Sequence, residues 1–205
     1  GFLSLVFDSW RKKELPAMVF PAGAEQLTLF PSFFIETDDE KALRVKKGII
    51  KAAGRDAFYK VEQCFLSCVD GKELLLLDYI RLCIGHGKKV LSMLADNTVH
   101  AVEKAAFACA REGHHYKGFV RFSVRGDVMT AVIEPKHSVL PLIAEHFCER
   151  YHAENFIIYD KTHGSALIYS KGNRAIVPAE GFEPPRADTS EIEARRLWKL
   201  FYDTI

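Results

Sequence analysis

The chain has 205 residues, of which 48% are hydrophobic, so it can bury a substantial core as one large domain or two small ones. Its 28 basic residues nearly balance its 27 acidic residues, which excludes the overall positive charge of proteins that coat nucleic acid nonspecifically. Any contact with nucleic acid must therefore come from a local basic patch.

Cysteine usage and hydropathy indicate the compartment. The five cysteines are odd in number and lack the paired spacing of a disulfide framework, which favours a reducing, cytoplasmic location. No apolar run reaches the roughly 20 residues that span a bilayer, so we expect a soluble protein with no membrane partner. The chain opens at Gly1 without Met and stops at Ile205 inside a helical pattern, so we expect it to be part of a longer protein.

The first part of the chain is predicted to be mainly helical. Apolar residues at helical spacing predict helices over residues 2–13, 38–53, 55–68, 72–84 and 97–112. Thr37 and Glu40 have the spacing of a capping box at the start of the second helix. A short strand is predicted before it, at 33–36, and Gly113 is predicted to end the fifth helix.

The second part has the pattern of a sheet. Runs of β-branched and aromatic residues predict strands over residues 118–124, 128–134, 155–160, 165–170 and 174–178. Short glycine-containing stretches at 125–127 and 171–173 are typical of hairpin turns. Residues 139–151 are predicted to form a helix between the second and third strands, and the proline-rich stretch 181–190 leads to a final helix.

This order of elements predicts a single α+β domain. It has a helical part over residues 1–113 and a mostly antiparallel sheet with one intervening helix over residues 114–180. A linker and a C-terminal helix complete it, over residues 181–205.

Two adjacent histidines, His114 and His115, fall where the helical pattern gives way to the strand pattern, in the run HHYKGFVRF. Imidazoles there could act as an acid or base or bind a metal, and Arg121 could hold an anion. Histidines at the end of a helix also interact favourably with its dipole, so a structural role stays open.

Two carboxylates are predicted at strand ends, and each has a histidine three residues later. Glu134 is followed by His137, and Asp160 is followed by His163. On neighbouring strands these groups could share a proton or bind a divalent metal. Carboxylates at strand ends also commonly cap the following turn. The candidate catalytic residues are therefore His114, Arg121, Glu134, His137 and Asp160; no metal ligand and no cofactor is assigned.

Cys64 and Cys68 begin a CxxxCxxC pattern, which would hold an iron–sulfur cluster, but position 71 is Gly. The third ligand is missing, and we expect both cysteines to be core residues. Nor does the sequence contain a Walker loop, a dinucleotide-binding GxGxxG, a GxSxG elbow or an HExxH motif.

The predicted helix at 38–53 carries a basic stripe beside its apolar face. Cations on one side of a helix can follow a nucleic-acid backbone, although a solvated face would show the same pattern. The candidate nucleic-acid-binding residues are Lys41, Arg44, Lys47, Lys51 and Arg55.

Six segments carry a resemblance that runs in order along almost the whole chain: GFLSLVFDSW, TDDEKALRVKKGI, EGHHYKGFVRF, IEPKHSVLPLIAEHF, NFIIYDKTHGSALIY and EIEARRLWKLFYDTI. They resemble the uncharacterised bacterial family labelled "probable DNA metabolism protein". The resemblance implies a role in DNA modification or repair beside a radical-SAM protein, and a uracil-DNA glycosylase-like domain fused to some members. It supplies no catalytic residue. His115 and His163 stand where the family commonly has Arg, and a basic, aromatic C-terminal tail of the family is absent.

Three functions follow as hypotheses. The first is a cytoplasmic DNA-metabolism factor that binds DNA, including single-stranded DNA, or a radical-SAM or glycosylase partner that performs the chemistry. The second is a metal-dependent or acid/base enzyme acting on a nucleotide or nucleic acid, which requires its candidate residues to meet in one cleft. The third is a structural adaptor, which predicts that those residues lie scattered.

Overall fold

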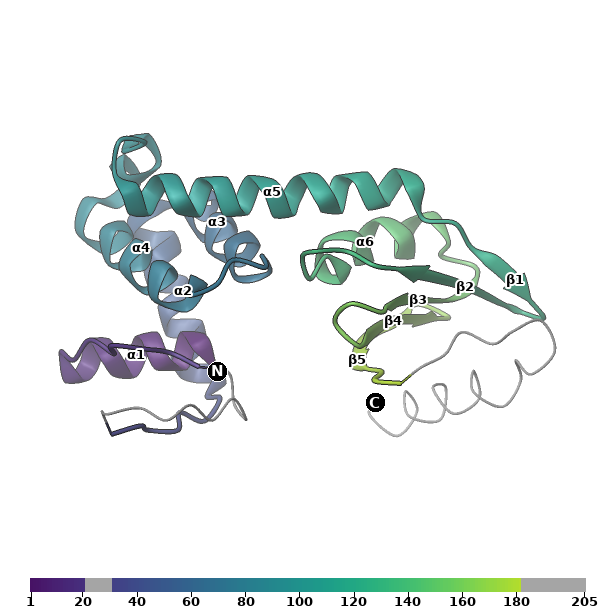
Figure 1. Cartoon of the computed structure of the whole chain (residues 1–205), viewed down its shortest axis with the longest axis horizontal. Helices are drawn as coiled ribbons and strands as arrows, with labels where there is room; N and C mark the ends of the chain where they lie inside the picture. Colours follow the sequence, from purple (N-terminus) through teal and green to yellow (C-terminus); the bar gives the residue numbers. More distant parts are fainter. Residues whose placement is uncertain (21–30, 182–205) are drawn as a thin grey trace. The chain divides into compact units, whose positions relative to one another are not determined.

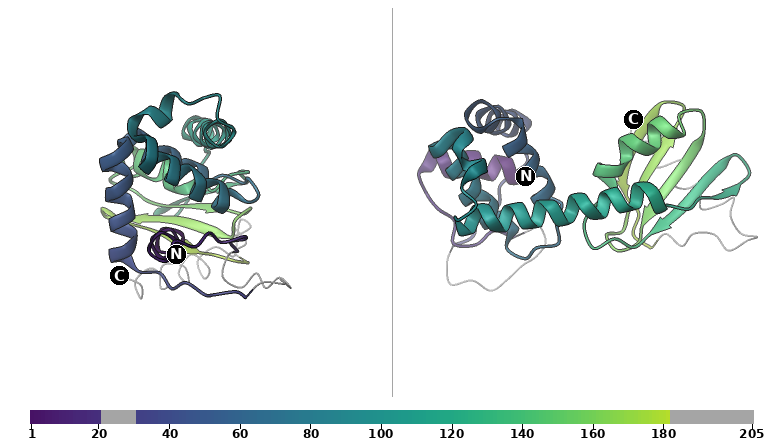
Figure 2. Two further views of the ribbon diagram at one scale, coloured as in Figure 1. Left: turned by 90° about the vertical axis from the view of Figure 1, so that its left-hand side faces the viewer. Right: turned by 90° about the horizontal axis from the view of Figure 1, so that it is seen from above.

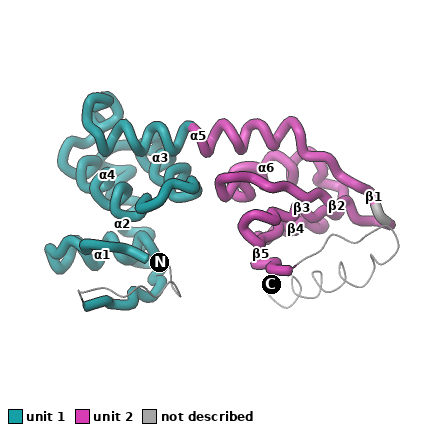
Figure 3. The backbone as a smooth tube through the Cα atoms, viewed as in Figure 1, with its two compact units in different colours: residues 1–107 teal, residues 108–205 magenta. Residues whose placement is uncertain are grey.

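The computed structural model describes residues 1–20 and 31–181 (Figure 1). The chain divides into two compact units, residues 1–107 and 108–205 (Figure 3). The predicted final helix and nearly all of the proline-rich connector lie outside the described residues.

The first unit is built from helices around one apolar core. The helices are α1 (Phe2–Lys12), α2 (Asp39–Ala53), α3 (Arg55–Phe65), α4 (Lys72–His86), the 3-10 helix η1 (Gly87–Ser92) and the start of α5 (Asn97–Phe119). The core residues include Ile49, Leu76, Tyr79 and Ile80, all fully or almost fully buried. The helices predicted for this part of the chain are thus confirmed, with α3 ending three residues early.

The predicted strand at 33–36 is wrong, because no strand forms there. The backbone in and just after this segment bonds to the start of the chain: the terminal amino group of Gly1 donates to the carbonyl of Ile35 at 3.5 Å, and Asp38 N–H donates to the hydroxyl of Ser4 at 3.0 Å. With Asp38 held in this way, its own carboxylate caps α2 by accepting the N–H of Lys41 at 2.9 Å. The cap of α2 is therefore Asp38, whereas the sequence had predicted Thr37.

Helix α5 does not end at Gly113, as the sequence predicted, but continues to Phe119. Gly113 is buried inside the helix, where an added Cβ would lie 3.3 Å from the Cβ and Cδ1 of Leu142. This glycine therefore serves close packing and does not stop the helix. Both histidines of the HHYKGFVRF run are helical as a result, and the strand predicted from residue 118 begins only at Ser123.

The second unit contains one five-stranded sheet in the order β1-β2-β3-β4-β5. Its elements are β1 (Ser123–Arg125), β2 (Val128–Ile133), α6 (Leu140–Arg150), β3 (Asn155–Asp160), β4 (Ser165–Ser170) and β5 (Asn173–Pro178). All neighbouring strands are antiparallel except β2 and β3, which are parallel and joined through α6. The predicted α+β fold, with a mostly antiparallel sheet and one intervening helix, is confirmed.

Helix α6 lies against one face of this sheet (Figure 2). Leu140, Ile143 and Phe147 of α6 form a core with alternate strand residues such as Phe156 and Leu167. The central strands β3 and β4 are buried on both faces, which explains their nearly continuous apolar sequences. Among the residues that the structure describes, no helix has the length and apolar character to cross a membrane.

Candidate functional site

The parallel pairing of β2 with β3 brings two of the predicted carboxylates to one edge of the sheet. In the register of these strands Ile133 is the partner of Asp160, so Glu134 follows β2 directly beside the end of β3. Lys161 N–H donates to the carbonyl of Ile133 at 3.0 Å and holds the two strand ends together. The carboxyl ends of parallel strands are where open sheets commonly bind ligands.

Asp160 and His163 form a close pair at this edge. The Asp160 side chain is 1% exposed, and its Oδ2 lies 2.7 Å from Nδ1 of His163. Its Oδ1 accepts the backbone N–H of His163 at 3.1 Å, so the carboxylate also caps its own turn. With Nδ1 occupied, Nε2 is the nitrogen through which His163, 29% exposed at its side chain, can exchange a proton.

Helix α5 contributes two further groups, Glu112 and Tyr116, which are one helical turn apart. The Glu112 carboxylate accepts the backbone N–H groups of Lys136 at 2.9 Å and His137 at 2.8 Å. Burial raises the pKa of Tyr116, and the carboxylate of Glu112 is the next largest cause. Asp160 and Glu134 raise this pKa further, while a hydrogen bond with the backbone of Glu134 opposes the shift. Tyr116 therefore lies among the acidic groups at the strand ends.

We call this group of residues the strand-end cluster: Glu112, Tyr116, Glu134, His137, Asp160 and His163. Sequence reasoning did not assign Glu112 or Tyr116 to a site: Tyr116 lay beyond the expected end of the helix at Gly113, and Glu112 lay within that helix. Their separation by four residues would have placed both on one helical face.

Within the strand-end cluster, Glu134 is the most open member. It pairs with Lys161 at 2.8 Å, and the two side chains are 64% and 62% exposed. Hydrogen bonding to Glu134 raises the pKa of Lys161. Such exposed pairs stabilise a fold only weakly, so Glu134 is free to exchange partners. His137, by contrast, is buried.

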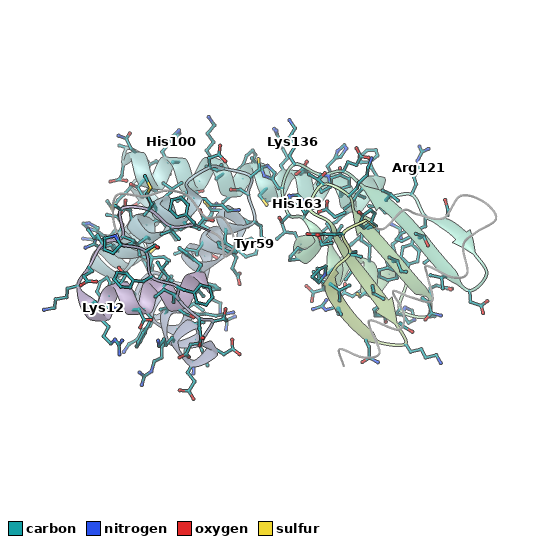
Figure 4. The ribbon with its side chains drawn as sticks, turned by 60° about the horizontal axis from the view of Figure 1, so that its bottom comes forward. Lys12, Tyr59, His100, Arg121, Lys136 and His163 are labelled. Atoms are coloured by element: carbon teal, nitrogen blue, oxygen red, sulfur yellow. The ribbon has the colours of Figure 1, made fainter. Side chains whose placement is uncertain are left out.

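His114 and Arg121 do not join the strand-end cluster. His114 is exposed and lies two residues from both Glu112 and Tyr116, about 200° around the helix from each. Arg121 is exposed and projects into solvent, well to one side of His163 (Figure 4). Of the predicted catalytic set, the structure thus places Glu134 and Asp160 at the ends of neighbouring strands and binds the backbone of His137 to Glu112 beside them, and it leaves His114 and Arg121 outside. Among the described residues, no three His, Cys, Asp or Glu side chains are arranged to hold a metal ion.

The basic stripe of α2 is only partly available. Lys41 turns toward α1, where its ammonium group bonds the carboxylate of Asp8 at 3.0 Å. Arg55 belongs to α3, because Gly54, with φ of 95°, separates the two helices. The remaining cations, Arg44, Lys47 and Lys51, form what we call the basic face of α2. Their side chains are exposed and pair with no acidic group of the described residues.

The two cysteines of the incomplete CxxxCxxC pattern differ in environment. Cys64 is a core residue, as predicted, and burial raises the pKa of its thiol from 9.0 to about 11. Cys68 is exposed, so the prediction that it lies in the core is wrong.

Comparisons with known proteins identify the family of the chain. No curated protein and no solved structure matches the chain. A family model described as the domain of unknown function DUF4130 matches residues 70–205, a range that contains α4, α5, the whole described sheet and every residue of the strand-end cluster. Since this range is more than half of its length, the chain belongs to the DUF4130 family.

Proposed function

We propose that the protein is a DNA modification or repair factor that binds nucleic acid through the basic face of α2. The observation that carries the proposal is that Arg44, Lys47 and Lys51 are exposed on one helix without an acidic partner in the described structure. They lie within two helical turns of each other, at a spacing that lets each cation approach a different phosphate.

The chemistry would come from a partner. The resemblance implies a separate radical-SAM protein or a glycosylase domain in that role, and with Gly71 in the third position this chain lacks the CxxxCxxC ligand set. In this proposal the chain acts in the cytoplasm and presents nucleic acid to that partner.

A salt series tests the binding. Affinity for single- and double-stranded DNA is measured by fluorescence anisotropy at increasing salt. It should fall, because the release of condensed counterions favours binding less as the salt concentration rises. The variant Arg44→Ala/Lys47→Ala/Lys51→Ala should weaken binding to all sequences and reduce the logarithmic salt slope by up to about 3. Affinity that does not depend on salt would contradict phosphate contacts.

A matched control removes the same charge elsewhere in the first unit. Arg81, Lys89 and Lys104 are also exposed, so their triple alanine variant has the same net charge as the α2 variant. An equal loss of affinity in both variants would show that net charge alone matters and that α2 has no special role.

The strand-end cluster favours a second candidate function, an acid/base enzyme acting on a nucleotide or nucleic acid. Asp160 would fix the orientation of His163, and Nε2 of His163 would accept or donate the proton, while Tyr116, kept protonated by its raised pKa, would donate a hydrogen bond nearby. DNA oligonucleotides and nucleotides are the substrates to screen, with and without divalent metals. Any activity should be lost in His163→Ala and kept in His152→Ala, which removes an exposed histidine of the same unit.

A further inference from the structure

The last turns of α5 expose two stacked rings. The rings of His115 and Phe119 lie one helical turn apart, with centroids separated by 4.4 Å and planes inclined by 25°. Phe119 is 68% exposed, although it is among the largest apolar residues. A ring pair of this kind stabilises a helix only slightly.

The stretch of chain that carries this ring pair is rich in basic residues. Between residues 111 and 122 the chain has three Lys or Arg residues and two histidines, and Glu112 is the one acidic residue. The Glu112 carboxylate accepts the backbone N–H groups of Lys136 and His137. Arg121 follows the ring pair and projects into solvent.

Neither ring is needed to build the core of the second unit. Gly113 packs against Leu142 of α6, and Tyr116 packs against the core that α6 shares with the sheet. His115 and Phe119 remain on the outside of the helix. They are thus free to receive another flat ring.

We infer that His115 and Phe119 form a stacking platform for unpaired bases of a single-stranded nucleic acid, with Arg121 contacting a backbone phosphate. Aromatic rings next to cations are the common means of binding single strands, because every base has a π-face and every nucleotide a negative charge. An apolar protein segment would fit the ring but not the basic residues of this stretch. The inference rests on the proposed nucleic-acid binding, but it concerns a different site from the basic face of α2.

Oligonucleotides with and without bases test the platform directly. The probes are a fluorescent thymidine 12-mer and an abasic 12-mer of the same length, which has the same phosphates but nothing to stack. The full chain should bind the thymidine probe more tightly, by roughly 5- to 150-fold for one stacked base. Phe119→Leu keeps an apolar side chain and removes the ring, so it should bring the two affinities within about 2-fold of each other.

Phe34→Leu is the matched control, because Phe34 is an equally open phenylalanine, 77% exposed, in the first unit. It should leave the preference for the thymidine probe unchanged. Thermal unfolding of both variants checks that each is folded, and His115→Ala provides a second test of the same platform if Phe119→Leu is unstable.

The outcomes separate the two proposals. Equal, salt-dependent binding of both probes by the unmodified protein would overturn the platform and leave the basic face of α2 intact. A preference for bases that persists in the triple α2 variant, with no change in salt slope, would overturn the α2 proposal and support the platform. An equal loss of the preference for the thymidine probe in Phe34→Leu and Phe119→Leu would also overturn the stacking platform.

Discussion

Oε2 of Glu112 accepts the backbone N–H of His137 at 2.8 Å and so fastens helix α5 to the turn after β2. The other oxygen, Oε1, accepts the N–H of Lys136 at 2.9 Å. One carboxylate thus satisfies two consecutive backbone donors at the edge of the sheet where the strand-end cluster lies.

Replacing Glu112 should therefore destabilise the protein. Glu112→Ala leaves both donors without this acceptor and should lower the free energy of unfolding by about 2 kcal/mol, measured in urea. Glu112→Gln keeps one good acceptor and should cost about half as much. Glu145→Ala, on the exposed side of α6, is the control and should change stability by less than about 0.5 kcal/mol. Equal stability of all three variants would show that the Glu112 bonds contribute nothing.

The Asp160–His163 pair predicts a single tautomer. Because Nδ1 of His163 lies 2.7 Å from the buried carboxylate of Asp160, the neutral ring should carry its proton on Nδ1. Two-dimensional NMR correlation of the ring nitrogens distinguishes this form by the ¹⁵N shifts. His100, which is exposed, is a reference ring in the same spectrum. Protonation of His163 at Nε2 in the neutral ring would contradict the pairing.

Two glycines of α5 should respond oppositely to substitution. Gly113→Val places methyl groups against Leu142 and should lower stability by about 1 to 3 kcal/mol, since the two helices must move apart. A Cβ at Gly118 meets nothing within 4 Å, so Gly118→Ala should raise stability by about 0.5 kcal/mol through helix propensity. Urea unfolding of both variants measures the difference. A stabilised Gly113→Val would mean that α5 and α6 are not closely packed at this point.

Stability should fall at alkaline pH. Burial raises the pKa of Cys64 and of Cys83 from 9.0 to about 11. Above pH 9 the thiols of the unfolded chain lose protons that the folded chain keeps. The unfolded state then binds fewer protons, so a rise in pH stabilises it relative to the folded state. The contribution of the two buried thiols to the free energy of unfolding is therefore complete below pH 9 and is lost as the pH rises toward 11. Unfolding free energies at pH 8, 9, 10 and 11 should decline less steeply in Cys64→Ala/Cys83→Ala than in the unmodified protein; equal slopes would contradict the shifts.

The same environments predict which thiol reacts first. At pH 8 an aromatic disulfide reagent should modify the exposed Cys68 quickly, and should reach Cys64 and Cys83 only when the protein unfolds. Mass spectrometry of digested protein identifies the modified residue. Cys68→Ser should lack the fast phase. Fast modification of Cys64 in the folded protein would show that the first unit opens readily.

The fold was largely predictable where local and long-range preferences agree. The bounds of β3 and β4 match the prediction, since continuous apolar runs bounded by turns suit strands that are buried on both faces. The predicted bounds were wrong where contacts distant in the sequence determine the local structure. Gly113 has the local preference of a helix end, but its packing on Leu142 keeps it inside α5. Residues 33–36 have the composition of a strand, but no strand pairs with them. The carbonyl of Ile35 accepts a hydrogen bond from the amino group of Gly1, at the start of α1.

The same contrast explains the candidate site. The sequence predicted Glu134 and Asp160 at strand ends, but whether they lie together depended on those strands being neighbours, which the parallel pairing of β2 with β3 decides. The position of His114 depends on the rotation of a helix whose end was misplaced, and no local pattern reports that rotation. Tyr116 was missed because it lay beyond the expected end of the helix at Gly113, whereas Glu112 lay inside the expected helix and was given no role.

Helix α5 supplies Val99 and Val102 to the core of the first unit, and Tyr116 to that of the second. Anyone who wishes to express the units separately therefore has no loop at which to divide the chain. A fragment that ends at residue 96 would leave the first core open, and one that begins at Ser123 would lose the helix from the second. Fragments should overlap, with α5 present in both.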